Sequence, residues 1–340
     1  MSSIGEPGGP VRRSGAGEAV TTGTAALLDA DVRTADALAH AGDLDEPASF
    51  LRRFAGHPLA VAGAVVLLVL GLAALFAPLI APQARVPDLT ASVRADALQG
   101  PSWHHLFGTD QLGRDQFSRV LYGLRVSLVV GIGVAVVSVV IGVTVGALAG
   151  WRGGWVDGLL MRFTDLFLVI PALVVLLVVA NNPDPSFFGI FHFPPATKVS
   201  GMVIILAALG WMPMARIVRG EFLSLREREY IDAARAAGAS GRRIVFTHLL
   251  PNCLGPIVVF ATLAVGITVL NEAVLSFLGT GVQSPNVSLG QMIADAEGTV
   301  GTDLAYLIVY PGLVLFVLVL AVNLVGDGLR DAIDPYRRRR

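Results

Sequence analysis

The chain of 340 residues has a single cysteine, Cys253, and a single lysine, Lys198. One cysteine excludes an intrachain disulfide and a cysteine-rich metal site. The six histidines lack the HxxxH and HExxH spacings of common zinc sites, so we expect no bound metal. A phosphate-binding P-loop ends in Gly-Lys followed by Ser or Thr, whereas Lys198 stands between Thr197 and Val199. We therefore expect this chain to bind no ATP or other cofactor and to have no catalytic residues.

Charged residues are scarce as well, at 15% of the chain, while 54% of the residues are hydrophobic and the mean hydropathy is +0.68. This is far more apolar surface than one water-soluble core can bury. The formal net charge of -1 gives no reason to expect a nucleic-acid partner. The composition therefore predicts an integral membrane protein in contact with lipid.

Six long apolar runs follow residue 58 and are separated by polar connections. A helix of about 20 apolar residues crosses the hydrocarbon core of a bilayer. The fourth run is the shortest, and Gly210, Trp211 and Pro213 interrupt it. The sequence therefore predicts an all-α fold with six transmembrane helices. The expected helices are Leu59–Ile80, Ser127–Ala149, Arg162–Ala180, Val199–Met214, Pro256–Leu278 and Leu304–Leu324.

The distribution of Lys and Arg predicts the orientation of these helices. Six crossings place both termini on the same side of the membrane. With both termini in the cytoplasm, 19 of the 25 Lys and Arg residues fall on the inside and six on the outside. Because cytoplasmic loops carry an excess of Lys and Arg, the sequence favours an N-in, C-in topology.

The rest of the chain divides into tails and connections. Residues 1–56 are rich in Gly, Ala, Ser, Asp and Glu, and we expect a flexible cytoplasmic tail in which only 25–41 favours a short helix. Residues 57–326 form the predicted membrane domain. Residues 327–340 form a predicted basic cytoplasmic tail, whose Arg337–Arg340 suit contact with anionic headgroups. A long inner connection at about 216–250 carries seven Arg against four acidic residues and is too polar to enter lipid.

This inner connection has the pattern of two short helices joined by a sharp turn. Alanine and arginine favour a helix from Glu229, and Gly238 can end it because glycine adopts the left-handed conformation without strain. A second short helix follows, and we expect Pro251 to end it and start the return to the membrane. The sequence thus predicts a compact helical elbow that projects into the cytosol.

The elbow resembles the EAA loop of ABC importer permeases, which docks into a groove on the ATPase subunit. The match consists of Asp232-Ala233-Ala234, Gly238 after three residues, and Leu250-Pro251. Asp232 replaces the usual Glu, and His248 stands where many families have Ile, which is similar to the peptide and nickel branch. The ATPase-coupling residues that this resemblance implies are Tyr230, Asp232, Ala233, Ala234, Gly238, Arg242, Arg243, His248, Leu250 and Pro251.

Three further motifs look like the C-type permeases of dipeptide and oligopeptide systems. They are 105–115 with Gly113-Arg114-Asp115, Leu275–Gly279, and 323–335 with Asp334-Pro335. The resemblance implies a type I ABC importer fold in the bacterial cell membrane, a second permease of the same fold and two cytosolic ATPases that hold ATP and Mg. It also implies an extracytoplasmic substrate-binding protein. Dipeptides, oligopeptides, nickel chelates and glutathione all remain open as substrates, and an ion-coupled secondary transporter is the alternative from another class.

Small residues recur every four positions in the second run, at Ser138, Gly142, Gly146 and Gly150. Such a row favours close packing against another helix backbone, although a pore-lining face would use the same residues. In the third run Arg162 and Asp165 are three residues apart, so we expect an ion pair, with a transport role as the alternative.

Two acidic positions have both a structural and a functional interpretation. Glu272, beside Asn271 in the fifth run, can line the pathway and meet a peptide's amino group, or it can bond to a neighbouring helix. Asp110 can cap a short outer helix on which Arg114 and Asp115 face solvent. Alternatively, Asp110, Arg114 and Asp115 form a docking surface for a binding protein.

Overall fold

The computed structural model describes residues 50–81, 96–169, 171–180, 186–187, 191–192, 198–282 and 286–333. Residues Met1–Ser49 and Phe50–Arg340 form separate units, and every described residue belongs to the second. The predicted helix at 25–41 and the arginines at 337–340 therefore lie outside the described residues.

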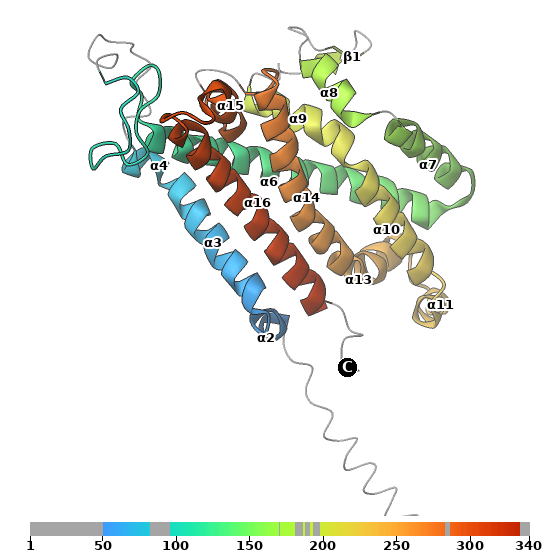
Figure 1. Cartoon of the computed structure of the whole chain (residues 1–340). Coiled ribbons are helices and arrows are strands. Elements are labelled where there is room, and N and C mark those ends of the chain that lie inside the picture. The colour runs from blue at the N-terminus through green and yellow to red at the C-terminus, as the bar shows by residue number, and fades with distance from the viewer. Residues whose placement is uncertain are drawn as a thin grey trace, which may run out of the picture. The chain divides into compact units, whose positions relative to one another are not determined.

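Helices make up nearly all of the described unit (Figure 1). The first half contains α2 (Phe50–Ala55), α3 (Pro58–Leu75), α4 (Ala77–Ile80), α6 (Gln116–Arg152), α7 (Gly154–Val169) and α8 (Ala172–Ala180). The second half contains α9 (Val199–Gly210), α10 (Met212–Leu225), α11 (Glu229–Ala236), α12 (Gly241–Arg243), a π-helical turn (Ile244–Leu249), α13 (Leu250–Asn252), α14 (Leu254–Phe277), α15 (Leu289–Asp295), a 3-10 turn (Glu297–Thr299) and α16 (Tyr306–Ile333). The two-residue strands β1 (Ser186–Phe187) and β2 (Phe191–His192) pair antiparallel.

Four of these helices are long and apolar enough to cross a membrane: α3, α6, α14 and α16. Helices α9 and α10 form a fifth candidate span if they are taken together, with a bend of 43° between them. The interruption expected from Gly210, Trp211 and Pro213 is thus a bend. The third predicted run is divided between α7 and α8, with Pro171 at the start of α8. Proline removes a backbone N–H and clashes with the preceding turn, which accounts for this break.

Helix α6 is longer than its apolar run predicted, because it begins at Gln116 and not near Ser127. Asp115 is its N-cap and accepts a hydrogen bond from the Ser118 amide at 2.8 Å. Helix α6 contacts α3, α9, α10, α14 and α16, and it crosses behind α16 and α14 in Figure 1. It is the central element of the fold.

The row of small residues on α6 packs against α10, as predicted. A Cβ atom on Gly146 would lie 2.4 Å from the carbonyl oxygen of Ala215, and one on Gly142 would lie 2.6 Å from the Cβ of Met214. At Gly150 the corresponding distance to the Cβ of Phe222 is 2.6 Å. These approaches are too close for any side chain, so the glycines let the two backbones meet.

A second close contact joins α3 to α16. A Cβ on Gly328 would lie 2.1 Å from the Cβ of Ala60 and 3.2 Å from the ring of Phe54. Phe54 belongs to α2, so residues 50–55 are helical and contact α16, contrary to the predicted flexible tail over 1–56. Helix α16 also continues past residue 326 to Ile333, beyond the predicted end of the membrane domain.

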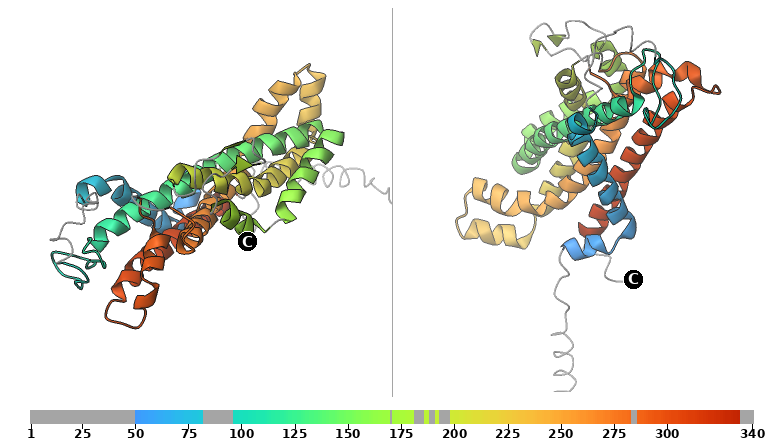
Figure 2. Two further views of the ribbon diagram at one scale, coloured as in Figure 1. Left: turned by 90° about the horizontal axis from the view of Figure 1, so that it is seen from above. Right: turned by 90° about the vertical axis from the view of Figure 1, so that its left-hand side faces the viewer.

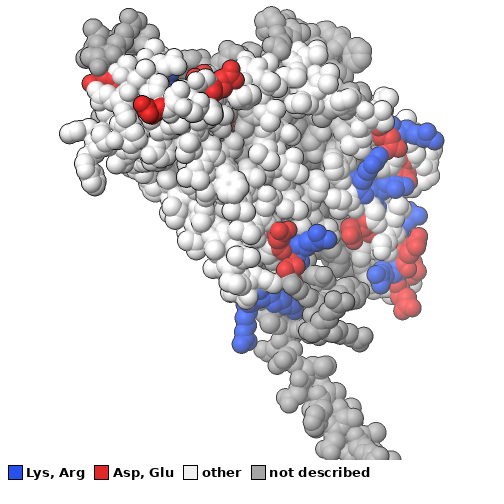
Figure 3. Space-filling model, viewed as in Figure 1, with Lys and Arg blue, Asp and Glu red and all other residues white. Residues whose placement is uncertain are grey.

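Charged side chains are scarce over the middle of the face shown in Figure 3. Figure 3 shows them at the two ends and along one edge of the visible face, while the area over α3 and α16 is almost free of them. Many large apolar side chains of α3 and α4 are exposed, among them Leu59, Leu68 and Leu79. An uncharged band between charged ends is the surface expected of a membrane-spanning protein.

Candidate coupling elbow and Asp110 cluster

The predicted elbow is a helical hairpin at one end of the molecule. Helix α11 leads to a turn, and α12, the π-helical turn and α13 return toward α14. The hairpin projects to one side of the long helices, near their lower ends (Figure 2, right). It thus offers a free surface at the end where Arg242 and Arg243 are exposed.

Gly238 ends α11 in the conformation that the sequence predicted. Its φ is +79°, and its amide donates to the carbonyl of Arg235 at 2.9 Å. The next amide, of Ala239, donates to Ala234 at 3.0 Å. These two bonds form a Schellman motif, in which the C′ residue is left-handed. Ser240 then caps the second helix by accepting from the Arg243 amide at 3.4 Å.

Pro251 does not end the second helix, contrary to the prediction. The helix continues through Asn252, and the turn before Pro251 is a π-helix over Ile244–Leu249. A proline inside a helix lacks an N–H and clashes with a carbonyl one turn back. The wider π turn provides a place for such a residue without ending the helix.

Buried apolar side chains fix the elbow to the long helices. Ile231, Ile244 and Leu249 are at most 1% exposed and belong to one core cluster with Phe222 of α10 and Cys253. Burial raises the pKa of the Cys253 thiol to about 12, so this cysteine is a neutral packing residue. The elbow is therefore held rigidly on α10 and α14.

Trp151, at the end of α6, supports the turn of the elbow. Its ring would be 3.0 Å from a Cβ on Gly241, and the Arg235 guanidinium lies 5.9 Å from the ring centroid. Arg235 also donates to Asp232 at 3.0 Å, so Asp232 pairs within its own helix. Sequence reasoning missed Trp151 because it precedes the elbow by more than 70 residues.

The outward face of the elbow combines apolar and cationic groups. Phe246 is 66% exposed and Tyr230 is 43% exposed, although both are large and apolar. The predicted coupling residues come together on this hairpin. Tyr230, Asp232, Ala233, Gly238, Arg242, Arg243 and Pro251 are exposed, and Ala234, His248 and Leu250 are half-buried. Phe246 was not among the predicted coupling residues, although a large aromatic side chain in a polar connection is a signal that could have identified it.

Ion pairs join α10 to α7. Asp165 pairs with Arg216, whereas the sequence predicted Arg162 as the partner of Asp165. Arg162 is three residues from Asp165 but exposed, and α10 packs on the face that carries Asp165. Arg219 donates through Nη2 to Oδ2 of Asp157 at 2.6 Å. Helix α7 is thus attached to the helix that leads into the elbow.

Acid is expected to weaken this attachment. The hydrogen bond from Arg219 holds the pKa of the Asp157 carboxyl below its ordinary value. Such a carboxyl stabilises the fold above its unfolded pKa of about 3.9, and the stabilisation is lost as the pH falls through the folded pKa. The unfolding temperature of the purified protein should therefore fall more steeply below about pH 4 than that of Asp157→Asn. Parallel curves for the two proteins would exclude Asp157 as the source.

Glu272 is fully buried between α14 and α6. Its carboxylate accepts hydrogen bonds from Ser127 at 3.0 Å and from Ser276 at 2.7 Å. Asn271, next to it in α14, is exposed. This geometry favours the structural interpretation of Glu272, with hydroxyl groups as its partners, and leaves only Asn271 on an open face.

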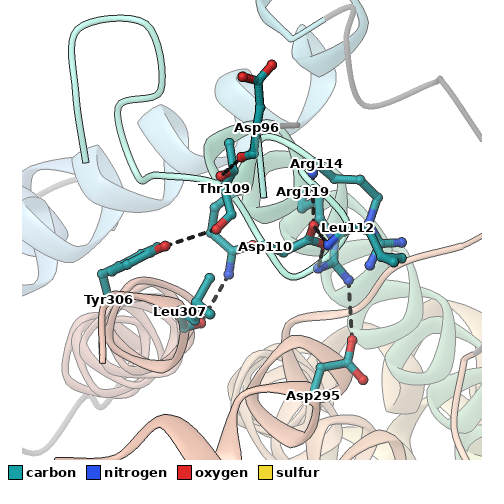
Figure 4. Close-up of polar contacts among 10 residues, drawn as sticks. Asp96, Thr109, Asp110, Leu112, Arg114, Arg119, Asp295, Tyr306 and Leu307 are labelled. Carbon is teal, nitrogen blue, oxygen red and sulfur yellow. Dashed lines mark hydrogen bonds and ion pairs between the residues drawn. The ribbon is translucent and has the colours of Figure 1, made fainter. Parts of the chain in front are cut away.

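At the end opposite the elbow, Asp110 organises a buried ion-pair cluster (Figure 4). Asp110 is 5% exposed, and its Oδ2 accepts from Nε of Arg114 at 2.7 Å and from Nη1 of Arg119 at 2.6 Å. Its Oδ1 accepts from the amides of Leu112 and Arg114. Asp110 therefore does not cap a helix, and its partner Arg119 was not among the predicted residues.

Asp115 takes the capping role instead, and it pairs with His105 at 3.1 Å. Arg114 and Asp115 are half-buried and do not face solvent as predicted. The reason is that Gly108 and Gly113, with φ of +75° and +78°, turn the chain back over the start of α6. Tyr306 of α16 holds this loop through its hydroxyl, 3.0 Å from the Thr109 carbonyl oxygen.

Two family models match the chain. Residues 142–339 match the family described as binding-protein-dependent transport system inner membrane component. Residues 48–101 match the N-terminal TM domain of oligopeptide transport permease C.

Several curated proteins are similar over most of their length. The oligopeptide transport system permease protein OppC of Mycobacterium tuberculosis is 40% identical over 288 residues, which is 85% of this chain and 94% of the relative. The dipeptide transport system permease protein DppC of Alkalihalophilus pseudofirmus is 37% identical over 284 residues, 82% of this chain and 86% of the relative. A peptide transport system permease protein of Brucella abortus is 40% identical over 284 residues, 84% and 90% of the two chains.

Long apolar helices with a charged hairpin at one end are the architecture of a multi-pass membrane protein. The chain belongs to the family of binding-protein-dependent transport system inner membrane components, the permease subunits of ABC importers. In this family the permease is non-catalytic and ATP hydrolysis belongs to a separate subunit. The family resemblance inferred from the elbow and the flanking motifs is confirmed.

Proposed function

We propose that this chain forms half of the translocation pathway of a bacterial importer for dipeptides or oligopeptides. Three relatives that match along most of the chain are named as peptide, oligopeptide and dipeptide permeases, which supports this substrate class. A second permease completes the pathway, an extracytoplasmic binding protein delivers the peptide, and two cytosolic ATPases carry ATP and Mg.

The proposal includes six crossings, with both termini in the cytosol. Four continuous helices and the α9–α10 pair give five candidate spans. The part of α7 from Arg162 onward and α8 together supply the sixth span, because Pro171 divides one apolar run into two halves. The excess of arginine on the elbow side supports a cytosolic elbow. Residues 57–326 are then the membrane domain, flanked by cytosolic segments at 1–56 and 327–340.

The exposed Phe246 is the observation that carries the coupling role. A large apolar side chain that is 66% exposed, on a hairpin anchored from beneath by Ile231, Ile244 and Leu249, suits insertion into a groove of a partner. Interface anchors of this kind are aromatic and surrounded by polar residues. Arg242 and Arg243 are exposed on the same hairpin, where they can form ion pairs with acidic residues around the groove of the partner.

Phe246→Glu is expected to separate the ATPase from the membrane subunit. Because the side chain is mostly exposed, the variant should reach the membrane at the wild-type level. Copurification of the ATPase should fall by about tenfold or more, since a central aromatic anchor contributes roughly 2 kcal/mol or more. Uptake of a radiolabelled dipeptide should fall in parallel. Phe246→Leu, which keeps an apolar group, is the control and should retain most of both activities.

Normal ATPase copurification with Phe246→Glu would refute the proposed docking face. Accessibility labelling of a cysteine placed at Phe246 gives an independent check, because the proposal requires it to be protected from reagents added outside intact cells.

A further inference from the structure

A cavity of about 310 Å³ lies at the end of the molecule opposite the elbow. It is bounded by the loop that carries Asp110, by α15 and by the start of α16. Met292 and Leu307 contribute apolar wall, and each is at most 3% exposed. This volume lies at the lower end of the range for small-molecule sites, which combine apolar walls with a few convergent polar groups.

Two buried polar atoms in residues that line this cavity have no partner within the described part of the chain. They are Nε of Arg119 and Oε1 of Gln116. The two residues are only 6% and 2% exposed. Buried donors and acceptors are nearly always paired, because an unpaired one has lost its hydration without compensation. One donor and one acceptor are thus left unsatisfied in residues that line the same pocket.

The guanidinium of Arg119 has one edge that is poorly occupied. Nη1 is satisfied by Asp110 at 2.6 Å, whereas Nη2 reaches Asp295 only at 3.4 Å (Figure 4). Nε and Nη2 lie on the same edge, and this edge is the one that a carboxylate binds with two parallel hydrogen bonds. The Asp295 side chain is 49% exposed and makes one long contact, so it is a weak competitor for this edge.

We propose that this cavity binds the carboxylate of a short peptide. The carboxylate displaces Asp295 toward solvent, which uncovers the Nε–Nη2 edge of Arg119, and then binds that edge. A peptide N–H donates to Oε1 of Gln116, and small side chains lie against Met292 and Leu307. The position of the site, opposite the elbow, places it on the extracytoplasmic side. The choice of a peptide as the carrier of the carboxylate rests on the proposed function.

Ligand-observed NMR titration of the intact importer in nanodiscs tests this site, with N-acetyl-dialanine as the probe. The amide of the same compound lacks the carboxylate and should bind about tenfold more weakly or not at all. Arg119→Lys keeps the positive charge for Asp110 but loses the bidentate edge, so it should weaken binding about tenfold or more. Arg125→Lys, an exposed arginine on the same helix, is the matched control and should leave binding unchanged.

Asp295→Ala gives a second test, whose expected result is tighter binding of the probe and so cannot be caused by misfolding. Removal of the competing carboxylate should tighten binding of the probe, by up to about fivefold for a partly exposed pair. Weaker binding by Asp295→Ala, equal binding of acid and amide, or no binding by the wild type would each overturn the proposal. The proposal would also be overturned if Arg119→Lys left binding of the probe unchanged and weakened only the binding of the importer to its substrate-binding protein. The guanidinium edge would then bind a side chain of that protein and not a peptide carboxylate.

Failure of this site is distinguishable from failure of the proposed function. If dipeptide uptake proceeds while the probe does not bind, only the cavity assignment is wrong. If no peptide is transported and the ATPase does not copurify, the proposed function itself is wrong.

Discussion

Gly238→Arg is expected to abolish dipeptide uptake and ATPase association while leaving the chain folded in the membrane. Gly238 has a φ of +79°, and no atom lies within 4 Å of a Cβ built on it. A side chain therefore meets no obstacle, and the cost of the left-handed backbone is about 1–2 kcal/mol. That cost is too small to unfold most domains. The arginine instead adds bulk and charge at the tip of the hairpin, where the proposed docking groove must close around α11.

Two milder substitutions separate strain from obstruction. Gly238→Ala has the same backbone strain with a single methyl group, and Gly238→Asn places a residue there that tolerates the left-handed conformation. Both should retain most of the uptake of the wild type. Transport assays in vesicles and copurification from membranes would measure the series. Wild-type uptake by Gly238→Arg would remove the elbow from the coupling mechanism.

Gly146→Leu is expected to prevent stable folding. A Cβ at this position already lies 2.4 Å from the carbonyl oxygen of Ala215 and 2.9 Å from the Cβ of Val218. The obstacle is the backbone of α10, so relief requires the two helices to separate. Overpacking of a well-packed core costs roughly 1–3 kcal/mol and occasionally more, and a leucine forced against helix backbone, which cannot rotate away, belongs to the cases that cost more.

Gly158→Leu is the matched control, because Gly158 of α7 has open space around the position of a Cβ, with nothing within 4 Å, and no unusual φ. Detergent extracts of both variants, compared by size-exclusion chromatography and thermal unfolding, give the measurement. Gly146→Leu should be aggregated or lost, and Gly158→Leu should resemble the wild type. Equal behaviour of the two would show that the α6–α10 contact tolerates separation.

Features that depend on neighbours in the sequence could be predicted well. The apolar runs located α3, α14 and α16, and the glycine spacing on α6 identified a close helix contact. Gly238 ended α11 where its conformational freedom required. Each of these follows from periodicity, hydropathy or backbone preference, which act over a few residues.

Features that depend on distant partners could not be predicted. Ser127 reaches Glu272 across 145 positions, and Gln116 donates to the Leu307 carbonyl across 191. Helix α6 begins before its apolar run because Gln116, Ser118 and Arg119 are polar residues held by partners outside that run. Hydropathy assigns such residues to loops, and only the tertiary fold shows that they are buried.

The 43° bend between α9 and α10 divides one candidate span into two arms with separate surroundings. The α9 arm packs in a cluster with Val130, Leu176 and Leu275, whereas the α10 arm packs with the elbow and Cys253. Trp211 lies at the break between the two helices. If the hairpin couples to an ATPase as proposed, its displacement would act first on the α10 arm, and the α9 arm would keep its separate packing.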